Sequence, residues 1–455
     1  MYVSDSSVNP KSEVLGGLLV LIRHYFHSLS SMFSPIEDVR RAASIHYSLE
    51  CVFSTGLLMF LCRLGARHMI TSNLRYDSVE INANYKLLFD TESVPHGDTV
   101  NYLFCKVNPE QVQDCLHKMI RRLLRKKVLY PFRLLDKYFR IAIDGTRLFS
   151  FKERHCPHCL KTKHKNGSVT YYHVVLEAKL LLPNGFAFSI MSEFVENEHE
   201  QVEKQDCELK AFYRLAARLK AAFPQLPLVL LLDGLYANGE VFEICRRFSW
   251  KYLIVLKDDD LPVLHQEYKA LRLLQTRNNR SLRPAPNLLL YQHFNWVKQV
   301  EYIDTKRRKH LLNVIECRES LNPSYAEEKD RKFKFITNIN PTEKNVPLLC
   351  QGGRDRWKIE NEGFNVQKNQ DFELEHAYTK HPNGWKVFYL VLQMSTIMEQ
   401  LLFKSNLLPD PLKKRIKTAK NLANRLLEAW RNYQLTVDRY EQLGRKRVQI
   451  RLDSS

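Results

Sequence analysis

Short apolar runs that end in an aspartate mark two strands in the middle of the chain. Residues 138–143 are aromatic, Ile and Ala apart from one arginine, and Asp144 follows them. Residues 226–232 are almost all Leu and Val, and Asp233 follows them. Apolar runs of this length that end at a turn residue are typical of buried strands. Each aspartate is therefore predicted either to stand at the rim of a sheet or to cap the next segment.

The hydrophobic pattern around these runs predicts their neighbours. Strands and helices in the order β-β-α-α-β are expected at 171–182, 185–192, 204–222, 238–248 and 251–256, with the second aspartate run between the two helices. The complete order is β-β-β-α-β-α-β, which is the order of the ribonuclease-H-like fold. In that order the first and fourth strands run parallel and adjacent. Asp144 and Asp233 would then lie side by side, as a divalent-metal site requires.

Changes in this pattern divide the chain into segments. We predict an α/β protein with a ribonuclease-H-like core built on a mixed sheet, interrupted by a β-containing insertion and preceded by an N-terminal helical domain. Within that domain, residues 1–35 are predicted to be loosely structured. The predicted segments are a helical, DNA-binding domain at 1–135, the first part of the catalytic core at 136–257, the insertion at 258–330, the end of the core with a glutamate helix at 331–405, and a basic helical tail at 406–455.

The charge balance narrows the class of partner. The 455 residues carry a formal net charge of +19, from 69 Lys and Arg against 50 Asp and Glu. Such an excess predicts a polyanionic partner, with nucleic acid first, although a membrane surface or a ribosome would also attract it. A predicted helix at 110–127 ends in a basic cluster that includes Arg121, Arg122 and Arg125. These side chains either bind phosphates or form a solvated surface beside the helix C-terminus.

The cysteines indicate the compartment. Most of the ten lie in apolar patterns, which is typical of free thiols in a reducing cytosol. No secretory signal is evident, and the apolar stretch at 14–22 is too short to span a bilayer. The sequence therefore predicts a cytoplasmic protein without a membrane partner.

Two of these cysteines have the spacing of half a zinc site. Cys156 and Cys159 form a Cys-x2-Cys motif. In the predicted sheet, the loop after the first strand, the start of the second strand and the start of the next helix lie at one edge. His173 and Cys207 are therefore predicted as the other two ligands, with His164 as the alternative fourth. The alternative is that Cys207 is a buried thiol of the core and that no zinc binds.

A third carboxylate is expected after the insertion. In a regular helix, Arg356, Glu360 and Lys368 would share one face, because they are separated by multiples of four residues. Trp357 and Phe364 would pack onto the sheet and aim Glu360 along its edge. Arg356 and Lys368 could then bind DNA phosphates beside a metal. The alternative is an ordinary ion pair on an amphipathic helix.

Two other acids compete with Glu360. Glu362 is close by, but it points away from the Arg356 face of the predicted helix. Glu208 opens the helix at 204–222. In ribonuclease-H nucleases, a helix glutamate joins the metal site, so Glu208 is a further possible ligand.

These residues together resemble a known family. Asp144 followed by Gly-Thr, Asp233 followed by Gly, and Arg356-x3-Glu360 are similar to the motifs of the DDE transposases of bacterial insertion sequences. More narrowly, they resemble the branch whose last motif is Tyr-x2-Arg-x3-Glu-x6-Lys and which has a β-rich insertion before the glutamate. The resemblance spans about residues 90–405, which is most of the chain.

The chain departs from that last motif at two positions. Gly353 stands at the tyrosine position, and Gln367 stands at the lysine position, with Lys368 one residue later. In the family these two residues contact terminal DNA phosphates. The departures therefore affect the handling of DNA ends, while the three acids are intact.

The resemblance implies a metal-dependent reaction on double-stranded DNA. Asp144, Asp233 and Glu360 would hold two Mg²⁺ or Mn²⁺ ions, which would activate water, and later a DNA 3′-hydroxyl, and stabilise the leaving oxygen. The substrates would be the ends of a transposable element and target DNA, bound by a dimer that forms on DNA in a bacterial cytoplasm, associated with the nucleoid. Two alternatives are a metal-dependent nuclease that cuts without strand transfer, and a domesticated, non-catalytic DNA-binding protein.

Overall fold

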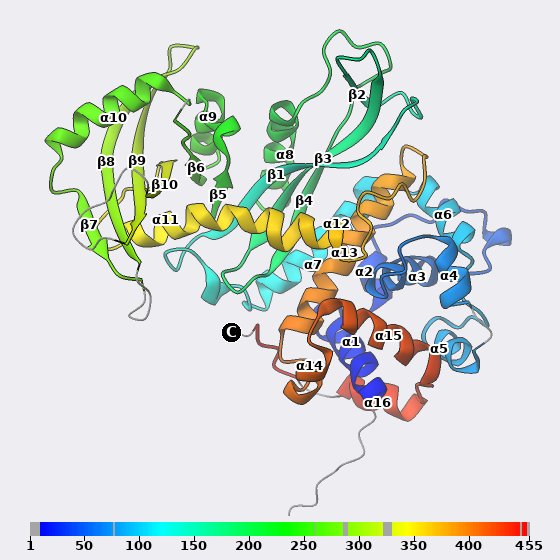
Figure 1. Ribbon diagram of the computed structural model, residues 1–455. Helices are drawn as coiled ribbons and strands as arrows, with labels where there is room; N and C mark the ends of the chain where they lie inside the picture. Colours follow the sequence, from blue (N-terminus) through cyan, green and yellow to red (C-terminus); the bar gives the residue numbers. More distant parts are fainter. Residues whose placement is uncertain are drawn as a thin grey trace, which may run out of the picture.

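The protein combines one large sheet with a body of helices (Figure 1). The computed structural model describes residues 10–75, 78–258, 260–284, 290–321, 330–445 and 448–452. Parts of the predicted segments 1–135, 258–330 and 406–455 therefore lie outside the described residues. Among the helices that are described, none combines the length and the apolar character needed to span a membrane.

Ten strands of the described chain form a single mixed sheet. Their order is β2-β3-β1-β5-β6-β10-β9-β8-β7, and β4 also pairs with β3. The bounds are Phe139–Phe151 (β1), Leu160–Lys163 (β2), Val169–Leu181 (β3), Ala187–Val195 (β4), Leu228–Leu232 (β5), Lys251–Val255 (β6), Asn279–Leu282 (β7), Tyr291–Ile303 (β8), Lys309–Ser320 (β9) and Arg331–Thr337 (β10).

The parallel pair expected from the sequence is confirmed. β1 and β5 run parallel and adjacent, with Ala142 opposite Leu231. β6 is parallel to β5, while β3 is antiparallel to both β1 and β4. β1 is longer than predicted and continues through Asp144 to Phe151, because its other edge still pairs with β3. On the β5 side the ladder stops after Ala142, so that edge of β1 is open beside Asp144.

The segment predicted as an insertion continues this sheet. β7, β8, β9 and β10 are antiparallel neighbours, and β10 pairs with β6. Helix α10 (Pro262–Leu274) contacts β8. The segment at 258–330 therefore contains strands, as predicted, and lengthens the edge of the sheet beyond β6.

The other helices belong to two groups. Those beside the sheet are α8 (Glu208–Ala222), α9 (Gly239–Arg247), α11 (Val346–Arg354) and α12 (Asn365–Asn369). Those of the helical body are α1 (Pro10–Phe26), α2 (Leu29–Phe33), α3 (Leu49–Leu61), α4 (His68–Asn73), α5 (Val79–Phe89), α6 (Gly97–Lys106), α7 (Pro109–Arg125), α13 (Gly384–Lys404), α14 (Asp410–Ile416), α15 (Ala419–Asn432) and α16 (Val437–Arg445).

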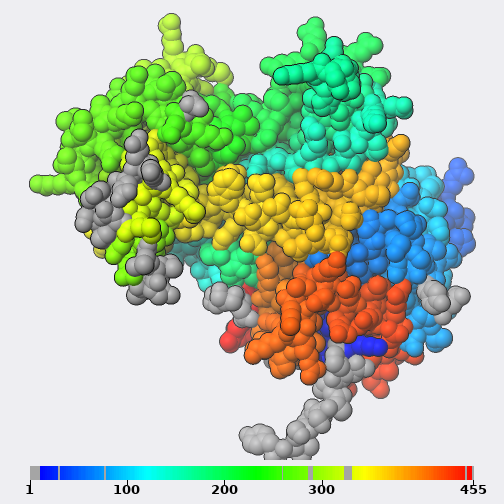
Figure 2. Space-filling view, viewed as in Figure 1, coloured from blue at the N-terminus to red at the C-terminus, as the bar shows by residue number. Residues whose placement is uncertain are grey.

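The start of the chain is part of the core, so the expectation of a loosely structured segment at 1–35 is wrong for its described residues. Leu15, Leu18 and Tyr25 of α1 are buried. Helix α1 is apolar on nearly every side because α7, α13, α15 and α16 all contact it. Figure 2 shows residues from both ends of the chain packed together, in blue and orange-red, below the yellow residues of α11 and α12. The first and last helices therefore share one core.

The helix predicted to carry Glu360 is irregular. After α11 comes a 3₁₀ turn, Asp355–Trp357, and then a π-helical segment, Ile359–Phe364. Residues four apart share a face only while the α-helical period is kept. Arg356 is consequently buried, whereas Glu360 and Trp357 are exposed, and Trp357 does not pack onto the sheet as predicted. Single-turn π segments of this kind are frequent at functional sites.

Candidate functional site

The two aspartates stand opposite each other on neighbouring strands. Ala142 is in register with Leu231, so continuing this register by two residues places Asp144 of β1 opposite Asp233. Asp233 follows the last residue of β5, and its Oδ1 accepts a hydrogen bond of 2.9 Å from the backbone N–H of Leu235. Both carboxylates are therefore held at the carboxyl edge of the parallel strands, where ligands of α/β sheets bind.

An arginine neutralises the first aspartate. Nη1 of Arg356 donates to Oδ2 of Asp144 over 3.2 Å, and the backbone N–H of Gly145 donates to Oδ1 over 3.0 Å. Burial, together with the negative charges of Glu208 and Asp233, nevertheless raises the pKa of Asp144 to about 6, although Arg356 opposes the shift. Like charges held together in a partly buried site are the usual setting of a cation-binding or catalytic centre.

Glu208 is the third acid that the fold brings to this pair. It is the first residue of α8, and its Oε1 accepts a hydrogen bond of 2.7 Å from the hydroxyl of Tyr236. A Cβ atom at Gly145 would lie only 2.7 Å from Oε2 of Glu208, so the glycine provides the space for this carboxylate. Burial raises the pKa of Glu208, and the charge of Asp233 adds to the effect. No pattern in the sequence pointed to Tyr236, which lies three residues after Asp233.

Glu360 and Glu362 are placed differently. The side chain of Glu360 is exposed, and it has no hydrogen bond or ion pair with the residues that the structure describes. Its π-helical segment contacts β1, so it lies near the sheet strand that carries Asp144. Glu362 faces Lys404 with 4.0 Å between Oε2 and Nζ. Glu360 thus remains free to turn toward a ligand, while Glu362 is directed toward the helical body.

The carboxylates of Asp144, Asp233 and Glu208 do not converge on a single metal position. Within the described chain, only one group of three or more His, Cys, Asp or Glu residues has its ligand atoms within 4.8 Å of one another. That group consists of histidines and cysteines, and it does not include these acids. Asp144 is paired with Arg356, and Glu208 with Tyr236. A hard divalent cation prefers such oxygen donors. Asp144 and Asp233 could bind one after Arg356 moves away from Asp144.

A basic cavity lies beside the aspartates. It has a volume of about 520 Å³, and Asp233 and Asp258 are the acids on its wall. Five basic residues also line it: Lys257, Lys332, Lys334, Arg354 and Arg356. Lys334 is paired with Asp258 at 2.8 Å, whereas Lys257 has no side-chain partner in the described part of the chain. The wall next to Asp233 is therefore suited to an anion such as a phosphate group.

The residues predicted to bind DNA have different surroundings. Arg121 donates to the carbonyl of Ala222 at 2.9 Å, and Arg122 donates to the hydroxyl of Ser31 at 2.7 Å. Lys368 is paired with Glu375 at 2.9 Å. Arg125 is exposed, with no side-chain partner among the described residues. Of these four, Arg125 is the one available to a phosphate without breaking an internal contact.

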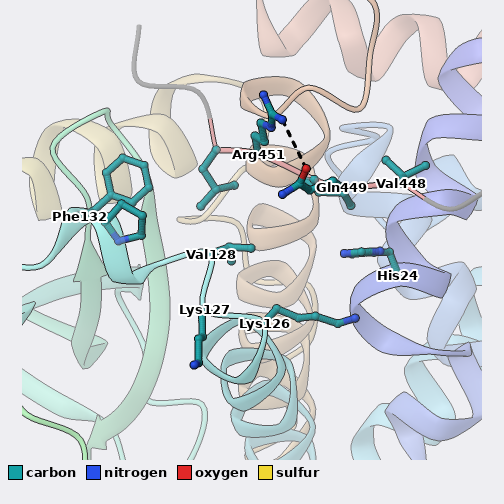
Figure 3. A pocket seen from close by; sticks show the side chains of 11 residues that line it. His24, Lys126, Lys127, Val128, Phe132, Val448, Gln449 and Arg451 are labelled. Atoms are coloured by element: carbon teal, nitrogen blue, oxygen red, sulfur yellow. Dashed lines mark hydrogen bonds between the residues drawn. The ribbon is translucent and has the colours of Figure 1, made fainter.

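The end of α7 leads into a large cavity. It has a volume of about 1040 Å³ and is lined on one side by Lys126 and Lys127 and on the other by residues 448–452 (Figure 3). His24 of α1 and Arg451 add two further nitrogen-bearing side chains to its wall. The basic cluster predicted on this helix therefore continues into a positively charged groove.

Both departures from the transposase motif point into the protein. A Cβ atom at Gly353 would meet the ring of Phe335 at 2.5 Å, so no larger side chain fits there. Gln367 is fully buried, and its Nε2 donates to Oε1 of Gln393 at 2.9 Å and to Thr396 at 3.2 Å. Neither position is open to DNA in this fold, because each takes part in internal packing.

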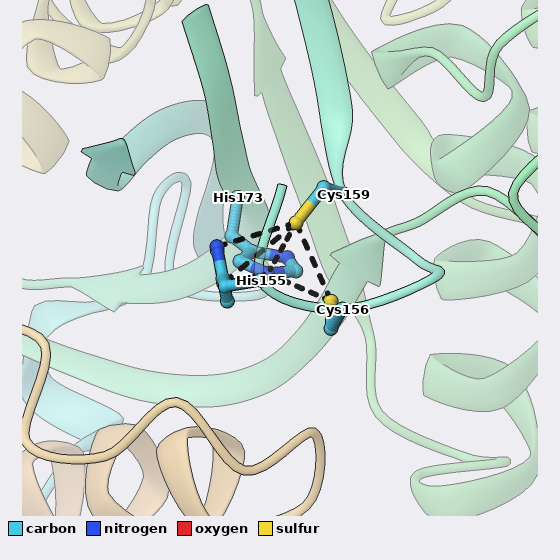
Figure 4. Close-up of side chains that lie close together, drawn as sticks. All are labelled: His155, Cys156, Cys159 and His173. Atoms are coloured by element: carbon cyan, nitrogen blue, oxygen red, sulfur yellow. Dashed lines mark hydrogen bonds between the residues drawn. The ribbon is translucent and has the colours of Figure 1, made fainter. Parts of the chain in front are cut away.

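A second group joins histidines and cysteines. His155, Cys156, Cys159 and His173 have one ligand atom each within 4.8 Å of one another (Figure 4). Cys156 and Cys159 are buried, and hydrogen bonds from Cys156 and from both histidines lower the pKa of Cys159. Three of the four predicted zinc ligands therefore come together.

The fourth residue of this group is not the one predicted as the fourth zinc ligand. Cys207 is exposed at the start of α8 and is not part of the group, and His164 instead contacts the hydroxyl of Thr170 at 2.8 Å. His155 takes the fourth position, because the loop before Cys156 folds back toward β3. The signal was present in the sequence, since His155 directly precedes Cys156.

No family model matches the sequence, and no curated protein matches it either. Among solved structures, the chain is similar to a cryo-EM structure described as a piggyBac transposase synaptic complex with hairpin DNA. The TM-score is 0.40 and the sequence identity is 9%, and the match covers 94% of this chain and 84% of that chain. A likeness of this strength is no basis for assigning a function.

Proposed function

We propose that this protein is a DNA transposase that cleaves element ends and joins them to target DNA with the help of divalent metal ions. The observation that carries this proposal is the parallel register of β1 and β5, which sets Asp144 opposite Asp233 at the open end of the ladder. Main-chain pairing of the two strands thus places two acids where a divalent cation could bind once Arg356 has moved away from Asp144.

The order of the strands supports a ribonuclease-H-like core. Five strands lie side by side in the order β4-β3-β1-β5-β6. β3 is antiparallel to both β4 and β1, whereas β1, β5 and β6 run parallel to one another. The sequence predicted one part of this arrangement, the parallel pairing of its first and fourth strands, which are β1 and β5. Helix α8, between β4 and β5, brings Glu208 to the same edge.

The acids and their neighbours have distinct roles in this proposal. Asp144 and Asp233 hold Mg²⁺ or Mn²⁺, and either Glu360 or Glu208 completes the site. Bound divalent ions supply the charge that activates a water or a DNA 3′-hydroxyl and stabilises the leaving oxygen. Arg356 keeps Asp144 paired before DNA arrives and then turns to a phosphate, which frees the carboxylate.

The basic surfaces fit the same substrate. The cavity beside Asp233 offers Lys257 and Arg356 to a phosphate next to the acids. The groove at the end of α7 offers Lys126 and Lys127 to a more distant part of the duplex. Phosphate contacts of this kind position DNA without reading its sequence.

A cleavage experiment with matched acid variants tests the proposal. The substrate is a supercoiled plasmid that carries the DNA flanking this gene on both sides, incubated with Mg²⁺ or Mn²⁺. The variants are Asp144→Asn, Asp233→Asn, Glu208→Gln, Glu360→Gln and the control Glu362→Gln. We expect cleavage and joining by the wild type and the control, and a loss of at least about 100-fold in both aspartate variants, because each removes a metal ligand.

The two glutamate variants identify the third acid, since only the true ligand is required for cleavage. Cleavage without joining would instead indicate a metal-dependent nuclease. DNA binding with no cleavage and no Mn²⁺ binding by the wild type would overturn the proposal in favour of a non-catalytic DNA-binding protein.

A further inference from the structure

Five distances within the histidine–cysteine group are close to the edges of a metal-centred tetrahedron, although the two sulfurs lie closer together than the ideal edge. The two Sγ atoms of Cys156 and Cys159 are 3.4 Å apart, and Sγ of Cys156 is 3.4 Å from Nε2 of His173. The Nε2 atoms of His155 and His173 are 3.1 Å apart, and Sγ of Cys159 is 3.7 Å from each of them. With ordinary zinc bond lengths, tetrahedral edges are about 3.8 Å between sulfurs, about 3.5 Å from sulfur to nitrogen and about 3.3 Å between nitrogens.

We propose that His155, Cys156, Cys159 and His173 bind one structural Zn²⁺ through two sulfurs, Nε2 of His173 and one ring nitrogen of His155. Two thiolates and two imidazoles in a closed tetrahedral set are typical of structural zinc sites, which leave no open position for a substrate. This site is separate from the acids proposed to hold Mg²⁺ or Mn²⁺, whose oxygen donors suit harder ions.

The surroundings are those of a preorganised site. Cys159 and His173 are fully buried, and Cys156 is 7% exposed. The ring centroids of Trp385 and His173 are 4.6 Å apart, and so are those of Phe151 and His155. These aromatic rings pack against both imidazoles, and His173 is shielded from water. Buried thiols and imidazoles that face only one another are otherwise costly, and a metal ion satisfies all four together.

The site ties three separate segments together. His155, Cys156 and Cys159 lie in the connection from β1 to β2, while His173 belongs to β3. The carbonyl of Cys159 accepts a hydrogen bond of 2.9 Å from Nδ2 of Asn197, which follows β4. Bound zinc would hold the long end of β1 against β3, where the β1–β3 register shifts.

The same contacts continue to the acid site. Oδ1 of Asn197 accepts a hydrogen bond of 3.1 Å from the backbone N–H of Asp206, two residues before Glu208. The connection runs from Cys159 through Asn197 and Asp206 to the start of α8. Zinc therefore braces the segment that positions Glu208, and this bracing does not depend on what reaction the acids catalyse.

Metal content and thermal unfolding of the whole chain test the proposal. We expect one zinc per chain in the wild type, measured by plasma mass spectrometry after growth with zinc. The Cys159→Ser and His155→Ala variants are expected to lose it, whereas Cys207→Ser, the matched control for the excluded ligand, retains it. A strong zinc chelator should lower the melting temperature of the wild type and of Cys207→Ser, because binding energy at a structural site is folding energy.

Substitution by cobalt reports the geometry independently. Intense visible absorption of the Co²⁺-loaded wild type, of the kind given by tetrahedral thiolate sites, would support the assignment, and its loss in His155→Ala would identify the fourth ligand. His155 is only half-buried, so this variant tests the site even if Cys159→Ser fails to fold. The proposal is overturned if the folded wild type binds neither metal, if Cys156 and Cys159 form a disulfide instead, or if Cys207→Ser loses zinc while His155→Ala keeps it.

Discussion

At the level of single residues, the acid site is built from groups that destabilise one another. Asp144 lies near the charges of Asp233 and Glu208, and one arginine compensates part of the repulsion. Gly145 allows Glu208 to approach, since any side chain there would overlap with its carboxylate. Such strain is a common property of functional sites, where a bound ligand supplies the missing charge.

This repulsion predicts a pH-dependent stability of Asp144→Asn. The pKa of Asp144 is about 6 in the folded chain, above its ordinary value of 3.8. A carboxyl group with a raised pKa stabilises the fold while it is protonated in both states, below about pH 4, and loses this contribution as the pH rises through 6. At pH 7.5, without divalent metal, charged Asp144 therefore opposes folding. This difference between the two pKa values corresponds to a loss of at most about 3 kcal/mol in the free energy of unfolding.

We expect urea unfolding in EDTA to show the variant gaining stability over the wild type as the pH is raised from 4.5 to 7.5. Added Mn²⁺ should restore the stability of the wild type, because only the wild type keeps both aspartate ligands. A stability difference that stays constant over this pH range would show that Asp144 is not held in a destabilising environment.

At the level of elements, irregular helical geometry decides which side chains meet. The 3₁₀ turn and the π segment between α11 and α12 separate Arg356, which reaches Asp144, from Glu360, which stays exposed. A regular helix would have put both on one face. The choice between Glu360 and Glu208 as third acid therefore depends on local backbone geometry that spacing alone cannot give.

Helix α1 gives a prediction at the same level. Leu15 is fully buried, and its helix α1 contacts helices of the C-terminal segment. Leu15→Ala should lower the free energy of unfolding by about 2–5 kcal/mol, the usual cost of a cavity in a packed core. Glu13→Ala on the same helix is the control and should change it by less than about 1 kcal/mol. Equal, small effects of both in urea unfolding would mean that α1 is not part of the core.

At the level of the whole molecule, basic side chains line two cavities that could receive a polyanion. One is the cavity beside Asp233, and the other is the groove formed by the end of α7 and residues 448–452. Other basic side chains make contacts within the protein. Arg121 and Arg122 form hydrogen bonds, and Lys368 forms an ion pair. Net charge therefore predicts the kind of partner, while the fold determines which charges can reach it.

The groove predicts a specific change in DNA binding. Lys126→Glu/Lys127→Glu should weaken binding to duplex DNA at least about tenfold and reduce the salt slope of log K by up to about 2, because two phosphate contacts are lost. Lys161→Glu/Lys163→Glu on β2 changes the net charge equally and serves as the control, since both of its lysines are exposed away from the groove. The same loss in both variants, in binding measured at several salt concentrations, would exclude a specific role for the groove.

The sequence by itself determined the two aspartate strands and their parallel pairing. Their apolar runs are long enough to be buried and stop at turn residues, and the order of the elements leaves few ways to pair them. It also determined the Cys-x2-Cys pair and His173, because local spacing and one predicted strand were sufficient to place them.

Only the tertiary structure decided which of the candidate side chains meet. His155 replaces Cys207 because of the path of a loop, and Glu208 reaches Asp144 because Gly145 has no side chain. Helix α1 is ordered because helices near the other end of the chain cover its apolar surface. Periodicity records which face of an element is apolar, but it does not record what packs against that face, and this is set by contacts between residues that are hundreds of positions apart.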